Sequence, residues 1–249
     1  MSSLETRKIE PQSGTTVTLG EAGDTVAVPA GAVVKTNTVK DSGGNALWSS
    51  DGSGNYTNVN SALVGSMTFI SSQTASSSAS ISFTTGINST YDEYVFYFVN
   101  MQPVTNNVQL SFQGSTDGGS NYNTTMTTTF FRASHDEAGT SSAFGYLADQ
   151  DQHQGTAYQQ FGETSPGIGN ASDESMSGEL HLFAPSSITY VKQFYAIDNY
   201  YQHNDRTNNS YIAGYLNTTS AINAVSFKMS SGNIGAGTIS MYGIKLWIS

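Results

Sequence analysis

The chain has 249 residues, no Cys and a net charge of −10, with only nine Lys and Arg. The lack of cysteine excludes a disulfide framework, a thiolate metal site and a cysteine nucleophile. So few basic residues predict no nucleic-acid partner and no attraction to an anionic membrane, and no apolar run approaches the roughly 20 residues of a membrane-spanning helix, so no membrane insertion is expected.

Residues 1–60 are expected to form a short-stranded N-terminal segment. Short apolar stretches alternate with glycine and proline in 13-SGTTVTLGEAGDTVAVPAGAVV-34, and the turn-rich 41-DSGGNALWSSDGSGNYTNVN-60 follows. A hairpin this small cannot bury its apolar faces alone, so we expect it to pack against copies of itself or to attach to another protein. The residues expected in these contacts are Leu4, Ile9, Val17, Leu19, Val26, Val28, Val33, Val34 and Trp48.

Residues 61–249 are expected to form an all-β body, an antiparallel β-sandwich of the jelly-roll kind. Helical periodicity is nearly absent, whereas apolar alternation and short apolar runs between turn residues recur along the chain. Several short strands in a body of this length favour a sandwich or a jelly roll. The predicted strands are residues 80–85, 94–99, 108–114, 178–184, 189–197, 211–216, 222–230 and 238–247.

Two of these strands carry a further prediction about their surroundings. The run 94-YVFYFV-99 is apolar on both faces, so it is expected in the middle of its sheet. In 108-VQLSFQG-114, Gln109, Ser111 and Gln113 alternate with apolar residues, which predicts one solvated face. The Ser-rich stretch that precedes the first predicted strand, 71-SSQTASSSASIS-82, is expected to be an exposed lead-in.

The long polar region 132–179 is a candidate for a catalytic site. It contains two histidines and several carboxylates, and two carboxylates held roughly 5–10 Å apart can hydrolyse a glycosidic bond. No spacing in the sequence fixes such a separation, and a solvated loop explains the same residues. No Gly-x-Ser-x-Gly motif marks a serine nucleophile. We therefore expect no enzyme. The acidic and histidine residues of this candidate site are His135, Asp136, Glu137, Asp149, Asp151, His153 and Glu163.

Metal ions and cofactors are not expected either. The turns 51-DGSGN-55 and 116-TDGGSN-121 carry oxygen ligands of the kind that calcium prefers. Neither has the spacing of an EF-hand loop, and both are explained as turns in which glycine adopts positive φ angles.

The stretch 194-FYAIDNYYQHNDRTNNSYIAGY-215 combines tyrosines with amide, carboxylate and guanidinium groups. Sugar recognition needs an aromatic surface for the apolar side of the ring and hydrogen-bonding groups for the hydroxyls, so a host glycan is a candidate partner. A hairpin whose tyrosines pack across strands explains the same residues. The residues of this candidate surface are Tyr195, Asp198, Asn199, Tyr200, Tyr201, Asn204, Asp205, Arg206, Tyr211 and Tyr215.

Three phrases of the chain resemble the virion fibre and decoration proteins of tailed bacteriophages. They are the glycine-punctuated 14-GTTVTLGEAGDTVAVPAGAVV-34, the link 41-DSGGNALWSSDGSGN-55 and the closing 231-SGNIGAGTISMYGIKL-246. The resemblance implies an N-terminal part that attaches to the virion or forms a stalk, and a jelly-roll-like head. It also implies a homotrimer and contact with the host surface. No functional residue of that family has a motif in this chain that carries over.

We therefore expect a structural virion protein, a fibre of a tailed-phage particle that contacts the host surface. Residues 1–60 are expected to bind other virion proteins and to pack in the homotrimer. Assembly is expected in the host cytoplasm, because MSSLETRKIE at the N-terminus lacks the apolar region of a secretory signal. A capsid decoration protein without a receptor role, and a glycan-binding adhesin or depolymerase, are the alternatives.

Overall fold

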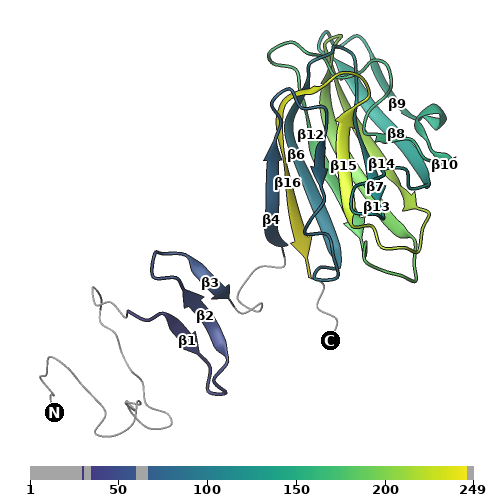
Figure 1. Cartoon of the computed structure of the whole chain (residues 1–249). Helices are drawn as coiled ribbons and strands as arrows, with labels where there is room; N and C mark the ends of the chain where they lie inside the picture. Colours follow the sequence, from purple (N-terminus) through teal and green to yellow (C-terminus); the bar gives the residue numbers. More distant parts are fainter. Residues whose placement is uncertain (1–29, 31–34, 60–66, 246–249) are drawn as a thin grey trace, which may run out of the picture. The chain divides into compact units, whose positions relative to one another are not determined.

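The chain divides into two compact units, Met1–Leu63 and Val64–Ser249. The computed structural model describes residue 30, residues 35–59 and residues 67–245 (Figure 1). Of the residues expected to mediate assembly, Trp48 belongs to the described part of the first unit. The others lie outside the described residues: Leu4, Ile9, Val17, Leu19, Val26, Val28, Val33 and Val34.

The described part of the first unit is a three-stranded antiparallel sheet, sheet A. Its strands, in spatial order, are β1 (Thr38–Lys40), β2 (Ala46–Ser50) and β3 (Tyr56–Val59). The register places Trp48 between Val39 and Val59, and its ring meets that of Tyr56 edge-on at a centroid distance of 5.8 Å. Every residue of β2 is only half-buried, so residues 35–59 form a single layer with an apolar face that they do not cover themselves.

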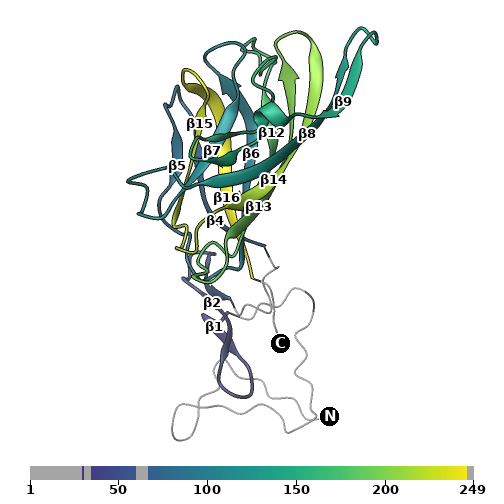
Figure 2. The same ribbon diagram turned by 90° about the vertical axis from the view of Figure 1, so that its right-hand side faces the viewer.

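The second unit is a sandwich of two larger sheets, and every described strand pair in it is antiparallel (Figures 1 and 2). Sheet B consists of β4 (Met67–Thr74), β6 (Glu93–Pro103), β8 (Met126–Asp136), β9 (Ser142–Tyr146), β10 (His153–Gly155), β12 (Met176–Phe183), β13 (Lys192–Gln202), β14 (Arg206–Leu216) and β16 (Ile234–Ile244). Sheet C consists of β5 (Ile81–Phe83), β7 (Leu110–Ser115), β11 (Gln159–Gln160) and β15 (Ala224–Met229). A short 3₁₀ helix, η1 (Ala148–Gln150), precedes β10.

Eight of these strands have the connectivity of a jelly roll. Sheet B contains the order β4-β16-β6-β12, and sheet C has the order β5-β15-β7-β11. Taken in chain order, these eight strands alternate between the sheets from β4 to β7, β11 then follows β7 within sheet C, and the alternation resumes through β12, β15 and β16. This is the double-sheet arrangement of eight strands in two Greek keys. The predicted jelly-roll-like sandwich is confirmed.

Five further strands widen sheet B beyond β12. The hairpin β13-β14 enters the chain between β12 and β15, and β8, β9 and β10 enter between β7 and β11. In space the sheet continues as β12-β13-β14-β8, with β9 and β10 both paired to the far edge of β8 (Figure 2). The added strands therefore give sheet B an outer face much wider than that of the eight-stranded jelly roll.

The described residues contain no helix long and apolar enough to span a membrane.

The interior between the two sheets is built largely from phenylalanine rings. Phe227 of β15 contacts four of them, at centroid distances of 5.5 to 6.5 Å: Phe83, Phe96, Phe112 and Phe161. These rings come from both sheets, and all five are at most 2 % exposed. Aromatic rings of this size contribute much of the buried apolar area of a core, so this cluster holds the two sheets together.

Each of the eight predicted strands overlaps a strand of the structure, and the stretch 94–99 lies in β6, between β12 and β16, as its two apolar faces predict. The prediction that the Ser-rich stretch 71–82 is an exposed lead-in is wrong, because its first residues belong to β4 and its last to β5. β4 pairs with β16 at the edge of sheet B, where polar side chains remain partly in water. Serine and threonine there do not prevent strand formation.

The prediction that β7 has one solvated face is also wrong. Gln109, Ser111 and Gln113 are at most 2 % exposed. The segment around β11 covers this face, and the side-chain amides of Gln109 and Gln113 donate to its backbone carbonyls, Gln109 to that of Glu163 at 2.5 Å. A buried amide costs free energy unless it is hydrogen-bonded, and these bonds offset that cost for the NH₂ groups of both side chains. Alternation of side chains shows that a strand has two faces but not which face another segment covers.

We predict that Phe227→Ala lowers the free energy of unfolding by about 3–5 kcal/mol, because it removes the ring that contacts both sheets and leaves a cavity. Urea unfolding followed by circular dichroism measures the effect. Phe144→Ala is the matched control, because Phe144 is 78 % exposed and its loss should change stability by no more than about 0.5 kcal/mol. Equal stability of the two variants would contradict the placement of the core.

Candidate functional site

Strand β13 divides the candidate glycan residues between the two faces of sheet B. Its burial pattern alternates strictly, with Tyr195, Asn199 and Tyr201 on the outer face, away from sheet C. Asp198 and Tyr200 belong to the inner face, and each is only 1 % exposed. The expectation that these two residues lie on a binding surface is therefore wrong, because neither side chain is open to a ligand from solution.

An aromatic row crosses the outer face where β13, β14, β8 and β9 pair. Tyr211 of β14 lies opposite Phe131 of β8, and their rings stack with centroids 4.8 Å apart and planes inclined by 5°. Tyr146 follows Phe131 in register on β9, and Ile197 lies opposite Tyr211 on β13. Sequence reading missed Phe131 and Tyr146, although the run of Thr and Phe in 126-MTTTFF-131, residue types that favour strands, could have revealed the strand of Phe131.

The remaining candidate residues lie on β14 and in the turn before it. Tyr215 shares the outer face with Tyr211 and is partly buried. Asn204 is exposed in the turn. The Asp205 carbonyl accepts a hydrogen bond from the backbone N–H of Glu137 at 3.1 Å, and the Arg206 guanidinium donates to a serine hydroxyl just before β9. Asp205 and Arg206 thus hold the tip of the hairpin against the segment that follows β8.

His181 of β12 fixes the position of Tyr195 on the outer face. The two rings stack with centroids 4.4 Å apart and planes inclined by 11°. The Nδ1 atom of His181 lies 2.5 Å from Glu93 Oε1, and its Nε2 atom lies 3.5 Å from Glu179 Oε1. Burial, followed by the charges of Glu179 and Glu93, raises the pKa of Tyr195, so its hydroxyl stays protonated and can donate a hydrogen bond.

Three adjoining hollows cross the outer face, with volumes of about 160, 410 and 320 Å³. The first shares Ile197 with the second, and the second shares Asn199 with the third. We call this string of hollows the outer groove. Its principal aromatic and amide side chains are Tyr97, Phe131, Tyr195, Asn199, Asn209 and Tyr211.

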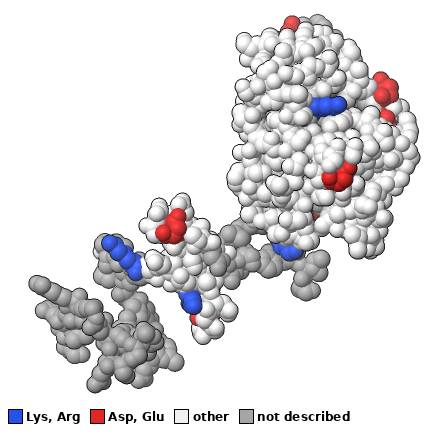
Figure 3. All heavy atoms as spheres, viewed as in Figure 1, with Lys and Arg blue, Asp and Glu red and all other residues white. Residues whose placement is uncertain are grey.

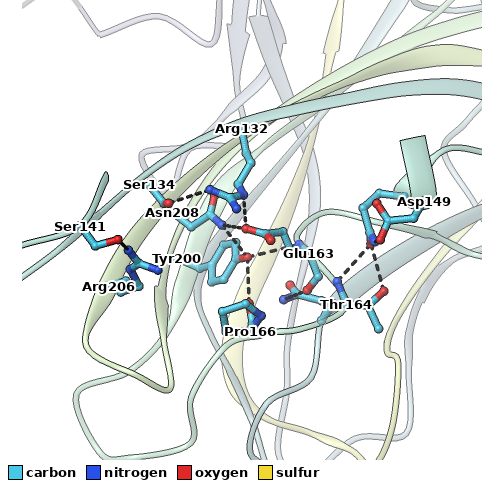
Figure 4. Close-up of polar contacts among 12 residues, drawn as sticks. Arg132, Ser134, Ser141, Asp149, Glu163, Thr164, Pro166, Tyr200, Arg206 and Asn208 are labelled. Carbon is cyan, nitrogen blue, oxygen red and sulfur yellow. Dashed lines mark hydrogen bonds and ion pairs between the residues drawn. The ribbon is translucent and has the colours of Figure 1, made fainter. Parts of the chain in front are cut away.

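A buried polar cluster lies beneath the outer groove, on the inner face of β13 and β14 (Figure 4). The Arg132 guanidinium of β8 pairs with the Glu163 carboxylate. The Asn208 amide donates to Glu163 Oε1 at 2.8 Å and to the Tyr200 hydroxyl at 3.0 Å, and that hydroxyl donates to the Pro166 carbonyl at 3.3 Å. The cluster therefore fixes the segment after β11 against the sheet, and Tyr200 has a structural role.

Asp198 lies on the same inner face, opposite Ser210 of β14. Among the described residues, no donor is in hydrogen-bonding geometry with either of its carboxyl oxygens. Burial raises the pKa of Asp198 well above its ordinary value, and the Ser210 hydroxyl offsets only part of that effect. The protonated form of Asp198 is therefore favoured inside the body.

The acidic residues after the start of β8 do not converge on one catalytic group. Asp136 accepts hydrogen bonds from Thr140 and Ser141, and these bonds, with that of the Thr140 hydroxyl the strongest, lower the pKa of Asp136 to about 2. Glu163 is buried in its ion pair, and Asp151 accepts from the hydroxyl of Tyr146. In the part of the chain that the structure describes, no three or more His, Asp and Glu side chains are grouped to hold a metal ion.

Three five-residue turns share one hydrogen-bonding pattern. In 41-DSGGN-45, 51-DGSGN-55 and 117-DGGSN-121, the backbone N–H and the side-chain amide of the Asn both donate to the carboxylate of the Asp. The Asn amide is the main cause that lowers the pKa of each Asp, that of Asp117 to about 2. In the two turns that were candidates for calcium binding, the carboxylates of Asp51 and Asp117 thus accept hydrogen bonds from the Asn of the same turn and close the loops between strands.

Comparisons of the chain with protein-family models, with curated proteins and with solved structures found no match. Within the described residues, the geometry of the site places exposed aromatic rings and amides along the outer groove and a buried polar cluster beneath it.

We predict that Asp198 makes the folded body less stable as the pH rises. An Asp carboxyl in the unfolded chain ionises near pH 3.9, whereas burial keeps Asp198 protonated to higher pH in the fold. Because the pKa of Asp198 is higher in the folded than in the unfolded chain, its contribution to the free energy of unfolding is fully present below the unfolded pKa. As the pH rises above that value, the free energy of unfolding falls by about 1.4 kcal/mol per pH unit until the pKa of folded Asp198 is reached.

Asp198→Asn removes this loss, so the variant should be more stable than the natural chain at neutral pH and similar to it near pH 4. Urea unfolding at a series of pH values measures the slope. Asp173→Asn, the same substitution at an exposed carboxylate, is the control. If both variants keep the pH slope of the natural chain, the burial of Asp198 is wrong.

Proposed function

We propose that the protein is a structural virion protein of a tailed-phage particle, a fibre whose N-terminal unit assembles and attaches and whose jelly-roll body contacts the host surface. The observation that carries the proposal is the division of the chain into a small sheet with an uncovered apolar face and a jelly roll with a core of its own. The three phrases that resemble phage virion proteins support it from the sequence.

Sheet A supports the assembly part of the proposal. Val39, Trp48 and Val59 lie side by side across its three strands. Three strands as short as these bury little apolar surface by themselves, so such an apolar face favours packing against something else. In a homotrimer, three copies of this face would close around one axis and supply each other with the core that a single copy lacks.

The outer face of sheet B supports the host-contact part of the proposal. It exposes large apolar side chains from several strands, with exposed fractions between 36 and 78 %. Apolar side chains that gather on one exposed face mark an interaction surface more often than scattered ones do. They lie on paired strands rather than on loops, so a partner would meet a surface that is already ordered. The exposed aromatic residues of this face are Phe69, Phe131, Phe144, Tyr146 and Tyr211.

We predict that the full-length chain forms a trimer in solution, with about three times the chain mass of 26.4 kDa, and that a chain starting at Val64 is a folded monomer. Light scattering during size-exclusion chromatography measures both masses. Trp48→Ala in the full-length chain should weaken the trimer and leave the unfolding of the body unchanged, because it removes the largest ring of sheet A.

A monomeric full-length chain would contradict the fibre and favour a capsid decoration protein, whose first unit meets its partner only on the particle. If the full-length chain and the chain starting at Val64 are both trimers, contacts between the bodies hold the trimer together, which would contradict the role given to sheet A. A trimer that Trp48→Ala leaves unchanged would do the same.

A further inference from the structure

The outer groove presents flat aromatic rings to solvent on rigid strands. Phe131 and Tyr211 are 38 and 36 % exposed although they stack on each other. This stacking occupies one face of the Tyr211 ring and fixes its orientation, and the hollow of about 160 Å³ lies between these rings, Tyr195 and Ile197. A ligand with a flat apolar side therefore finds an ordered aromatic surface here without an entropic cost for arranging it.

The polar groups along the outer groove keep hydrogen-bonding capacity that the protein does not use. The Asn199 amide donates to the Thr207 hydroxyl at 2.9 Å, and the Asn209 amide donates to a β13 carbonyl at 2.7 Å. These bonds orient both amides, while no donor among the described residues bonds the side-chain oxygen of either. The hydroxyls of Tyr195 and Tyr211 likewise have no partner within the described residues. A ligand that carries several hydroxyl groups would satisfy these atoms.

The charges of the outer groove restrict the ligand further. Glu137 and Glu179 line it, whereas none of the described Lys and Arg residues does. An anionic ligand would be repelled by these carboxylates and by the net charge of −10, and would find no described Lys or Arg of the groove to pair with. Charged side chains are also sparse on the side of the body that Figure 3 shows. The ligand should therefore be uncharged.

We propose that the outer groove binds uncharged sugar units of a polysaccharide, with the free face of Tyr211 against a sugar ring and Asn199 and Asn209 bonded to its hydroxyl groups. A pyranose has an apolar side of C–H groups that fits an aromatic ring and a rim of hydroxyls that fits amides. The hollows extend from β8 to β6, so the groove takes several successive units rather than one. This inference rests on the proposed function and names what the body would contact.

Binding of the labelled full-length chain to an array of neutral and acidic oligosaccharides tests the inference. We expect binding to neutral members and none to their sialylated or uronic-acid counterparts. Tyr211→Ala should weaken that binding about tenfold, which corresponds to about 1.4 kcal/mol. Asn199→Ala, on another strand, should weaken it as well, so that a folding defect in one variant does not decide the result. Tyr190→Ala is the matched control, because Tyr190 is 72 % exposed in the loop between β12 and β13 and does not line the groove.

Three outcomes would overturn the inference: no binding to any neutral member, a preference for acidic members, or binding by Tyr211→Ala and Asn199→Ala equal to that of the natural chain. The mass measured on the same preparation separates this result from the proposed function. If the chain is a trimer that binds no glycan, the proposal for the outer groove is rejected and the proposed fibre is unaffected. If the chain is a monomer that binds neutral glycans, the proposed fibre assembly is rejected and the proposal for the outer groove is unaffected.

Discussion

The pairing of β13 with both of its neighbours is the constraint on which the two faces of the body depend. All eleven residues of β13 pair with β14, and seven of them also pair with β12. Because side chains alternate along a strand, this register decides at once which groups are buried and which line the outer groove. A slip by one residue would expose Asp198 and Tyr200 and bury Tyr195 and Asn199.

The jelly roll and its two insertions both contribute residues to the outer groove. The eight-stranded framework contributes Tyr97 and Glu179, while the added strands contribute the stacked pair Phe131 and Tyr211. On the inner face, the Arg132 cluster fixes the covering segment to the added strands, so these strands are held from behind. The aromatic rings therefore lie on a framework that a ligand need not rearrange, which is the arrangement that a binding site requires.

Sequence reasoning reached the fold more readily than the site. The period of two in stretches such as 108–114 predicted strands and a sandwich, because alternation is a local property of the backbone. The same period could not show that Gln109 and Gln113 are covered by a segment some fifty residues away, or that Tyr200 points inward while Tyr201 points outward. Phe131 was missed because the Thr-rich start of β8 merges with a polar, acidic region whose strand depends on pairing with β14.

A footprint of exposed side chains by hydroxyl radicals is the most direct measurement of where the body binds. The full-length chain would be oxidised with and without neutral oligosaccharides of the array, and the tyrosines would be compared by mass spectrometry. We expect the ligand to protect Tyr97, Tyr195 and Tyr211 and to leave Tyr190 unchanged. Protection of Tyr190 while Tyr211 stays fully reactive would contradict a binding site on the outer face of sheet B.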